Sequence, residues 1–577
     1  MKKLLLSVVL FAFSWLSADA CTSYLVTRGA SKDGSTMITY AADSHIRYGE
    51  LYFRPAGKHA PGTMVQLYDR STNKPLAQIP QAAETFRVVG MTNEFGVSIG
   101  ESTFGGIERL KDTTGGVDYG SLMFVTLQRA KTAREAIKFM VELVEKYGYY
   151  SSGESFSISD TNEVWYVEMI GKGTKMSQPK KAGEKAVNLR RGAIWVALLV
   201  PDGYISAHAN QARIRQFPLE KKGVKHSISS KNLHKIFDPE VTCVYAHDVI
   251  SIAKEEGLFS GKDEDFSFSD TYDPVNFLQV RACDARVWTM FNRLADGMEQ
   301  YWDYAKGENL ANRLPLWVKP NRKVTPQDLM ACYRDHFDNT ELDMRNDIGA
   351  GPYRAPYRWR PMRFEYEGKT YFHERTTATQ QTAFAWIAQS RPNFPAAELG
   401  TIVLFGVDDM ASTVFVPFYA AMLKAPDYYA EGNGDILTYS PTAAFWAFNK
   451  VANYAYSRYS DMIQDINKKQ AELETQFADS IAIWDKRAME LWKKNPQTAR
   501  EYLTAIGCRW GDTTVETWNR LFEFLLVKYM DGNIKHETDG KFIRTPYGYP
   551  KPPMHPELPD FWKKIIIDNT GNKFLKQ

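Results

Sequence analysis

The chain has 577 residues, of which 44% are hydrophobic and 24% charged, and its formal net charge is +3 at pH 7. This is the composition of a globular protein with room for two or three structural units, and its nearly balanced charge gives no electrostatic basis for binding nucleic acid. After residue 20, no apolar stretch approaches the roughly 18 residues that a membrane-spanning helix needs, so we expect no membrane span.

The first 20 residues have the layout of a secretory signal peptide. Two lysines precede an apolar run at 4–16, and small residues occupy positions 18 and 20. The run is too short to cross a bilayer as a helix. We therefore predict a cleaved signal peptide at 1–20 and a secreted or periplasmic protein whose mature chain begins at Cys21.

A cysteine at a new amino terminus carries its thiol beside a free α-amine. The amine titrates at about 7.7–8.0, close enough to neutral to accept the thiol proton, so nucleophile and general base could share one residue. Two other interpretations stay open at this point: a structural cysteine, or a lipoprotein acylated at Cys21. The lipoprotein fits poorly, because such signals usually place leucine where this chain has Ala18, and Asp19 follows.

The sequence after Cys21 predicts a β-hairpin. Ser23–Thr27 and Thr36–Tyr40 have strand composition, and Asp33-Gly34 between them is a good hairpin turn signal. The hairpin would place Asp43 at the far end of its second strand, near Cys21.

From residue 87 to residue 405 the sequence predicts many strands and few helices. An apolar stripe and the pattern Thr132-x-x-Glu135 predict a capped helix over 132–147. Further helices are expected near 244–256 and 284–297. Strands are expected at 87–92, 97–100, 155–159, 163–169, 193–199, 204–207, 376–388 and 400–405. This order favours an α+β fold with antiparallel sheets.

The last part of the chain changes character. Residues 442–485 contain neither proline nor glycine and predict helix, with a break at Asn495-Pro496. The tail after residue 531 is rich in proline, so we expect it to be extended on the surface.

The five cysteines are an odd number. In an oxidising compartment, up to two disulfides could form among Cys243, Cys283, Cys332 and Cys508, and Cys21 would then remain a free thiol. The alternative is four isolated buried thiols. Their spacing does not indicate zinc, and we expect neither metal nor cofactor. His208 could suggest a catalytic Cys–His pair, but a single histidine at a strand end is more often structural.

The order of several motifs resembles one known family. Cys21-Thr22-Ser23-Tyr24-Leu25-Val26, the turn around Asp33-Gly34, and Asp43-Ser44 resemble the start of the dipeptidase A (PepD-like) family of cysteine N-terminal nucleophile hydrolases. Similar motifs follow at 93–97, 164–168, 201–203, 209–214, 285–288, 374–376 and 415–419, so the resemblance covers roughly 21–530.

The resemblance implies a fold, an activity and roles for four residues. The fold would be a four-layer αββα core of two antiparallel sheets, distantly similar to penicillin V acylase and bile salt hydrolase. The activity would be metal-free hydrolysis of dipeptides or short peptides. Cys21 would be the nucleophile, Asp43 would orient its amine, Asn210 would donate to the oxyanion, and the turn at Asn93 would supply a second donor.

One position departs from the family pattern. Many relatives carry an arginine three residues before the early aspartate, where this chain has Tyr40. Either another cation takes its place, with Arg28 and Arg286 as candidates that the sequence does not favour, or the amine alone lowers the pKa of the thiol.

Together these inferences predict a secreted cysteine dipeptidase. The units would be the signal peptide (1–20), an N-terminal nucleophile catalytic body (21–440), a helical region (441–530) and an extended tail (531–577). The alternatives are an N-acyl amide hydrolase of the same superfamily and, from another class, a membrane-tethered binding lipoprotein. Substrate side chains and oligomeric state are left open by the sequence.

Overall fold

The computed structural model describes residues 20–179 and 185–576. The predicted signal peptide at 1–20 therefore lies outside the described residues, except for Ala20. The fold is α+β and built mainly from antiparallel strands, as predicted.

A seven-stranded sheet carries Cys21, and every neighbouring pair in it is antiparallel. In spatial order its strands are β17 (Trp317–Val318), β14 (Ile205–His208), β1 (Ala20–Val26), β2 (Thr36–Asp43), β20 (Thr382–Ser390), β21 (Thr401–Val407) and β22 (Val416–Tyr419).

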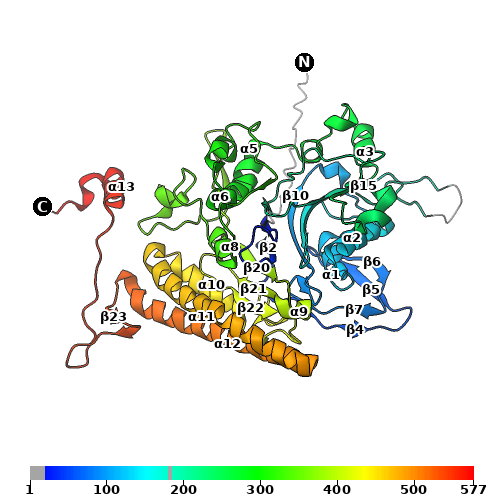
Figure 1. Ribbon diagram of the computed structural model, residues 1–577. Helices are drawn as coiled ribbons and strands as arrows, with labels where there is room; N and C mark the ends of the chain where they lie inside the picture. The colour runs from blue at the N-terminus through cyan, green and yellow to red at the C-terminus, as the bar shows by residue number, and fades with distance from the viewer. Residues whose placement is uncertain (1–19, 180–184, 577) are drawn as a thin grey trace, which may run out of the picture.

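A nine-stranded sheet lies against it, antiparallel except where β15 pairs with β16. Its order is β15 (Ser227–Ser229), β16 (Cys243–Tyr245), β13 (Ala193–Leu199), β12 (Val164–Gly171), β11 (Gly153–Ser159), β10 (Ser98–Gly105), β9 (Thr92–Asn93), β8 (Val88–Val89) and β3 (Phe53–Arg54). Contacts of β1 and β2 with β10, β11 and β12 join the two sheets face to face (Figure 1).

Helices pack on the outer faces of the two sheets (Figure 1). The nine-stranded sheet contacts α1 (Tyr119–Leu127) and α2 (Ala133–Tyr147). The seven-stranded sheet contacts α6 (Ala285–Leu294), α8 (Pro326–Tyr333), α9 (Ala397–Gly400), α10 (Ala444–Ala455), α11 (Tyr459–Lys494) and α12 (Pro496–Tyr529). With both faces covered, β2 and residues 21–26 of β1 are buried, which explains why their sequences do not alternate cleanly between polar and apolar residues.

The predicted hairpin is confirmed by β1 and β2. The carboxylate of Asp33 accepts hydrogen bonds from the backbone N–H and hydroxyl of Ser35, and Gly34 has φ of 75°, which glycine adopts without steric cost. The register pairs Cys21 with Ala42 and Ala20 with Asp43. The turn therefore fixes which residue stands next to the nucleophile candidate.

Several expected elements differ in their bounds. The expected helix at 244–256 was wrong at its start, because 243–245 form β16 beside β13, and α3 covers only Val249–Glu255. Pairing at the sheet edge outweighs the local helical pattern there. Thr132 caps α2 as predicted, but Glu135 accepts from the N–H of Lys131 and so does not close the capping box.

The C-terminal helices are confirmed, with Asn495 as N-cap and Pro496 as first residue of α12. The expectation of a wholly extended tail was wrong. It contains a hairpin of β23 (Glu537–Thr538) and β24 (Lys541–Phe542), and α13 (Asp560–Thr570) lies beyond the body at the red end of the chain (Figure 1).

The remaining elements are short. They are the strands β4 (Gly57–Lys58), β5 (Met64–Tyr68), β6 (Pro75–Pro80), β7 (Glu84–Thr85), β18 (Arg363–Tyr366) and β19 (Lys369–Phe372), and the helices α4 (Phe268–Tyr272), α5 (Phe277–Gln279) and α7 (Trp302–Ala305).

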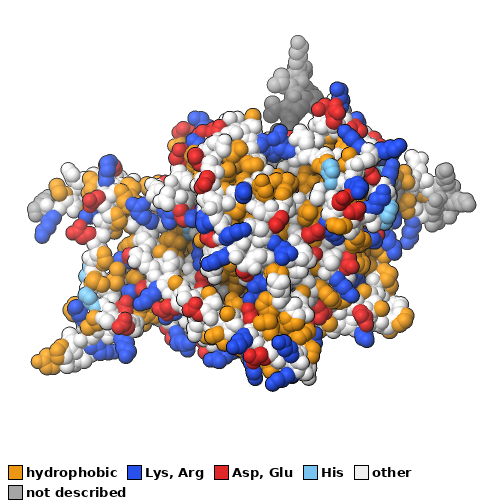
Figure 2. Space-filling model, in the orientation of Figure 1, with side chains coloured by type: hydrophobic (Ala, Val, Ile, Leu, Met, Phe, Trp, Pro, Cys, Tyr) orange, Lys and Arg blue, Asp and Glu red, His pale blue; other side chains and the backbone are white. Residues whose placement is uncertain are grey.

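On the surface, acidic and basic side chains are interspersed over the visible face (Figure 2), as the low net charge leads one to expect.

Candidate active site

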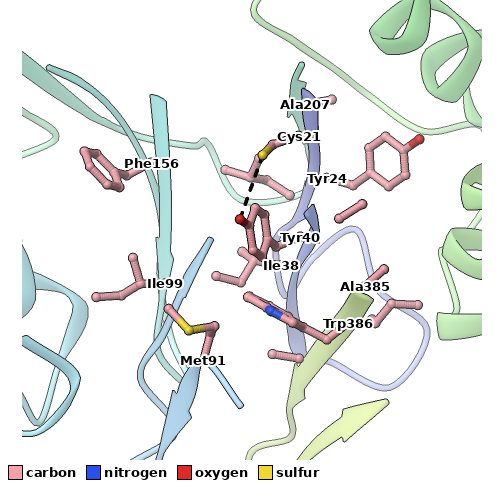
Figure 3. Packing of buried hydrophobic residues seen from close by; sticks show 14 of the residues in the cluster. Cys21, Tyr24, Ile38, Tyr40, Met91, Ile99, Phe156, Ala207, Ala385 and Trp386 are labelled. Atoms are coloured by element: carbon pink, nitrogen blue, oxygen red, sulfur yellow. Dashed lines mark hydrogen bonds between the residues drawn. The ribbon is translucent and has the colours of Figure 1, made fainter. Parts of the chain in front are cut away.

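Cys21 lies in β1 between the two sheets, with 4% of its surface exposed. In this structure its nitrogen is the peptide nitrogen that joins it to Ala20. The side chain faces the nine-stranded sheet, with its sulfur beside the hydroxyl of Tyr40 (Figure 3). Four other segments of the chain contact Cys21, which distinguishes it from an ordinary cysteine of the hydrophobic core.

Arg286 and Asn210 hold the backbone of Cys21. The side-chain oxygen of Asn210 accepts a hydrogen bond from the Cys21 N–H at 2.9 Å, and the Arg286 guanidinium donates to the Cys21 carbonyl at 3.0 Å. Arg286 also donates to the Asn210 side-chain oxygen at 2.8 Å and to the Thr22 hydroxyl at 2.7 Å. Arg286 is fully buried, so its charge is satisfied mainly by these oxygens.

The backbone of Asn210 adopts a left-handed conformation, with φ of 59°. Asparagine tolerates this region better than most residues, and here it turns the side-chain amide toward Cys21. The backbone N–H of Asn210 donates to the Ser102 hydroxyl at 3.3 Å, and its side-chain nitrogen donates to the Thr103 carbonyl at 2.7 Å. The residue is therefore fixed against β10.

Tyr40 and Glu101 lie on the sulfur side of Cys21. The Tyr40 hydroxyl donates to the Glu101 carboxylate at 2.6 Å. The Cys21 sulfur is 3.6 Å from the same carboxylate oxygen and 3.8 Å from the Tyr40 hydroxyl. Glu101 is 1% exposed. Burial, followed by the charges of Cys21 and Glu101, raises the pKa of Tyr40 well above its usual value, so Tyr40 remains a neutral donor.

Asp43 is buried at the end of β2, where the sequence predicted it. The Thr382 hydroxyl donates to its carboxylate at 2.6 Å. Its strand partner is Ala20, the residue before Cys21, so the Asp43 position is next to the bond whose cleavage would create the amine.

Arg375 is a charged neighbour of the site that the sequence alone did not single out. Burial and then the charge of Arg286 lower its pKa to about 10, while Cys283, Asp43 and Cys21 raise it. Its motif, Glu374-Arg375-Thr376, is part of the family resemblance, which implied no role for Arg375.

The hydrogen bonds of Asn93 lie within its own turn and at the end of α1. Both hydrogens of its side-chain amide are used, one on the Leu127 carbonyl and one on the Ala130 carbonyl, each at 2.7 Å. Its backbone N–H donates to the Val97 carbonyl. These bonds hold the turn in place, and a second oxyanion donor from this turn stays a prediction.

Of the two candidate arginines, only Arg286 reaches the site. Arg28 donates to the Gly34 carbonyl and the Asn162 side chain, so it belongs to the hairpin turn. His208 is structural, as expected: its ring lies 2.6 Å from the Ser102 hydroxyl and stacks on Tyr166. Burial, and then Arg213, lower its pKa to about 3, so it is neutral at pH 7.

All five cysteines are free thiols, so the alternative of isolated thiols holds. Burial raises the pKa of Cys243 and Cys332 to about 12 and also raises that of Cys283, which makes these thiols inert at neutral pH. Within the described part of the chain, no group of three or more His, Cys, Asp or Glu side chains could hold a metal ion. Nor is any of the described helices long and apolar enough to cross a bilayer.

The profile of peptidase family C69 matches residues 63–472, which is more than half of the chain. The chain belongs to this family. The resemblance deduced from the motifs is therefore confirmed, and with it the expectation of a cysteine-type peptidase. The matched region contains Glu101, Asn210 and Arg286, whereas Cys21 and Asp43 precede it.

Curated relatives carry dipeptidase names. A probable dipeptidase of Latilactobacillus sakei is 25% identical over 519 residues, which cover 85% of this chain and 91% of the relative. A probable dipeptidase B of Lactococcus lactis subsp. lactis is 24% identical and covers 78% and 83%. A dipeptidase of Bifidobacterium longum is 23% identical and covers 59% and 63%.

Proposed function

We propose that this C69 peptidase is a secreted dipeptidase whose nucleophile is Cys21, exposed when residues 1–20 are removed. The observation that carries the proposal is the convergence of Arg286, Asn210, Tyr40 and Glu101 on one buried cysteine. The dipeptidase names of the relatives support the substrate class. We further propose that the two facing sheets and their outer helices are the αββα core of an N-terminal nucleophile hydrolase.

The reaction begins at the new amino terminus. The free α-amine of Cys21 takes the thiol proton as the sulfur attacks the carbonyl carbon of the scissile bond. Asn210 holds this amine, since its side-chain oxygen already accepts from the same nitrogen in the peptide form. Asp43, the partner of Ala20 in the strand register, orients the amine from the other side.

The carbonyl oxygen becomes negative when the sulfur adds. The side-chain amide of Asn210, which lies next to Cys21, is the proposed oxyanion donor. The tetrahedral intermediate then collapses, the amine returns the proton to the leaving amino group, and a thioester forms. Water attacks the thioester, releases the acid product and restores the thiol.

A cavity of about 570 Å³ adjoins Asp43 and gives room for a small substrate. Ser44, which follows Asp43, and Thr382, which donates to it, both line this cavity. Its basic lining side chains are His45, Arg47, Arg358 and Arg360. A site with basic walls suits the carboxylate at the end of a dipeptide.

The burial of Cys21 argues against the lipoprotein alternative. An acylated cysteine must stand at a membrane surface, whereas Cys21 lies between two sheets and contacts Tyr40 and Glu101. Lipidation would also block the amine that the reaction needs.

The experiment that tests the proposal uses the chain that begins at Cys21. It is incubated with a panel of free dipeptides and with the N-acetylated form of each, and released amino acids are quantified by chromatography. We expect hydrolysis of the free dipeptides. Cleavage of the acetylated set alone would replace the proposal by the N-acyl amide hydrolase.

A further inference from the structure

Glu101 is a buried acid in contact with the nucleophile. Its carboxylate oxygen lies 3.6 Å from the Cys21 sulfur, and the residue is 1% exposed. Neither the family pattern nor the motifs of the sequence gave it a role.

A carboxylate is an unexpected neighbour for a sulfur that must become an anion. A negative charge at this distance opposes formation of the thiolate, more so where little water screens it. Tyr40 donates to the carboxylate but brings no positive charge, because its pKa is raised and it stays neutral. A carboxylate at this distance therefore raises the free energy of the thiolate, and a positive charge bound beside Glu101 would lower it.

A dipeptide carries such a charge close to the bond that is cut. Its α-ammonium is separated from the scissile carbonyl carbon by a single carbon atom. When that carbonyl stands about 3–3.5 Å from the sulfur, in position for attack, the ammonium lies within reach of an acceptor that is itself 3.6 Å from the sulfur.

We propose that Glu101 binds the α-ammonium of the substrate and thereby restricts hydrolysis to peptides with a free amino terminus. This inference rests on the proposed function, since it takes Cys21 as the nucleophile. Tyr40 is a positioning residue: its hydroxyl fixes the carboxylate oxygen that faces the sulfur. The ammonium offsets the negative charge of the carboxylate when the thiol loses its proton. A substrate with a free amino group therefore also lowers the free energy of the attacking thiolate.

The same geometry disfavors N-acylated substrates. An acyl group at this position brings no charge and would leave Glu101 buried beside the developing thiolate. When one member of a buried ion pair is absent, the binding affinity of the complex falls strongly. Discrimination between a dipeptide and an N-acyl amino acid is thus assigned to one side chain on β10.

The test compares two substrates that differ chiefly in the amino group, L-alanyl-L-alanine and propionyl-L-alanine. Both release alanine, which is quantified. We expect the wild-type chain beginning at Cys21 to prefer alanyl-alanine by about 100-fold or more in kcat/KM. In Glu101→Gln, kcat/KM for alanyl-alanine should fall by about 100-fold and that for propionyl-alanine by less than about 10-fold, so that the preference is largely lost.

The matched control is Glu154→Gln. Glu154 is also a buried acid, on β11, and it accepts a hydrogen bond from Thr103, two residues along β10 from Glu101. Its substitution should leave the ratio of the two kcat/KM values unchanged. The rate of Cys21 alkylation by iodoacetamide is measured in each variant as a readout of the nucleophile. Removing the charge of Glu101 should not slow it.

Three results separate the possibilities. Loss of the preference with alkylation intact supports the inference. Equal loss on both substrates with slower alkylation would overturn it and assign Glu101 to the nucleophile itself; an unchanged preference would also overturn it. If the wild-type chain cleaves no free dipeptide, the proposed function fails before the role of Glu101 is reached.

Discussion

The two sides of Cys21 differ in charge and in what they contact. On one side, Arg286 and Asn210 contact the backbone of the residue, through its carbonyl and its nitrogen. On the other side, Tyr40 and Glu101 contact the sulfur. The first side is cationic and contacts the backbone of Cys21, whereas the second is anionic and contacts its sulfur. In the proposed mechanism, separate groups therefore position the nucleophile and select the substrate.

The two sides also come from different parts of the fold. Arg286 lies on α6 and Asn210 in the loop after β14, far along the chain from Cys21. Tyr40 lies on β2 and Glu101 on β10, strands of the two facing sheets. Substitutions on each side should therefore give distinct kinetic effects.

The largest effect is expected from removing the sulfur that both sides surround. Cys21→Ala should lower kcat for alanyl-alanine by more than about 10⁴-fold, because no other group can form the thioester. Circular dichroism should show an unchanged fold. Cys508→Ala, which removes a partly exposed thiol, is the control and should retain full activity. Activity of Cys21→Ala within tenfold of the wild type would contradict the account.

Next in size is the effect of Asn210 on the cationic side. Asn210→Gly removes the amide while glycine accepts the positive φ, so the backbone is spared. We expect a loss of about 10²–10³-fold in kcat on both alanyl-alanine and propionyl-alanine, typical of a lost oxyanion donor. Asn393→Gly, at another asparagine of positive φ, controls for the glycine itself. A change in KM alone would show that Asn210 only binds substrate.

A smaller effect is expected from Tyr40 on the anionic side. Tyr40→Phe removes the hydroxyl that donates to Glu101 and should lower kcat/KM for alanyl-alanine by about 10-fold. Propionyl-alanine should be affected less, since it does not use Glu101. Tyr24→Phe is the control, because Tyr24 lies on the opposite side of β1 and its hydroxyl is directed at the Cys332 carbonyl (Figure 3). Equal effects on both substrates would remove Tyr40 from the account of selectivity.

The smallest effect concerns the free energy of unfolding and comes from His208, which is connected to Asn210 through Ser102. Ser102 bonds to His208 and also accepts from the N–H of Asn210. His208 has a folded pKa of about 3 against an ordinary 6.5, so the unfolded chain binds its proton first as the pH falls. The folded state therefore loses stability from about pH 6.5 downward, by about 2 kcal/mol at pH 5 from this residue.

The measurement for His208 is urea unfolding at pH 7 and pH 5. Wild type should lose more stability between the two pH values than His208→Gln, whose side chain does not titrate. His336, with a pKa lowered to about 4, acts in the same direction and is present in both proteins, so it cancels in the comparison. An identical pH dependence in the two proteins would contradict the buried neutral His208.

The sequence was most informative where chemistry and local structure coincide. The Asp33-Gly34 turn predicted the hairpin, and strand geometry then placed Asp43 beside the start of β1. Asn210 was found through its motif. The role of Asn93 stays a prediction, because a turn asparagine that bonds to nearby backbone has the same sequence signature as one that serves a site.

Glu101 was beyond reach of the sequence for a physical reason. Glu101 comes to Cys21 only because the two sheets pack face to face, and no local pattern fixes that packing. Arg286 was one of two candidate arginines in the sequence, and only the fold shows that it is the one that is buried and donates to oxygen atoms of Cys21, Thr22 and Asn210. The tail helix α13 was missed because the prolines of 546–559 dominate the composition of its surroundings.

The central claim is that Cys21 needs a free α-amine. The most direct measurement compares two chains that differ by one residue, one beginning at Cys21 and one beginning at Ala20, with intact mass confirming each terminus. The account predicts that the first hydrolyses alanyl-alanine and that the second is slower by at least about 10³-fold, since its nitrogen is a peptide nitrogen that cannot accept the thiol proton. Equal rates for the two chains would contradict it.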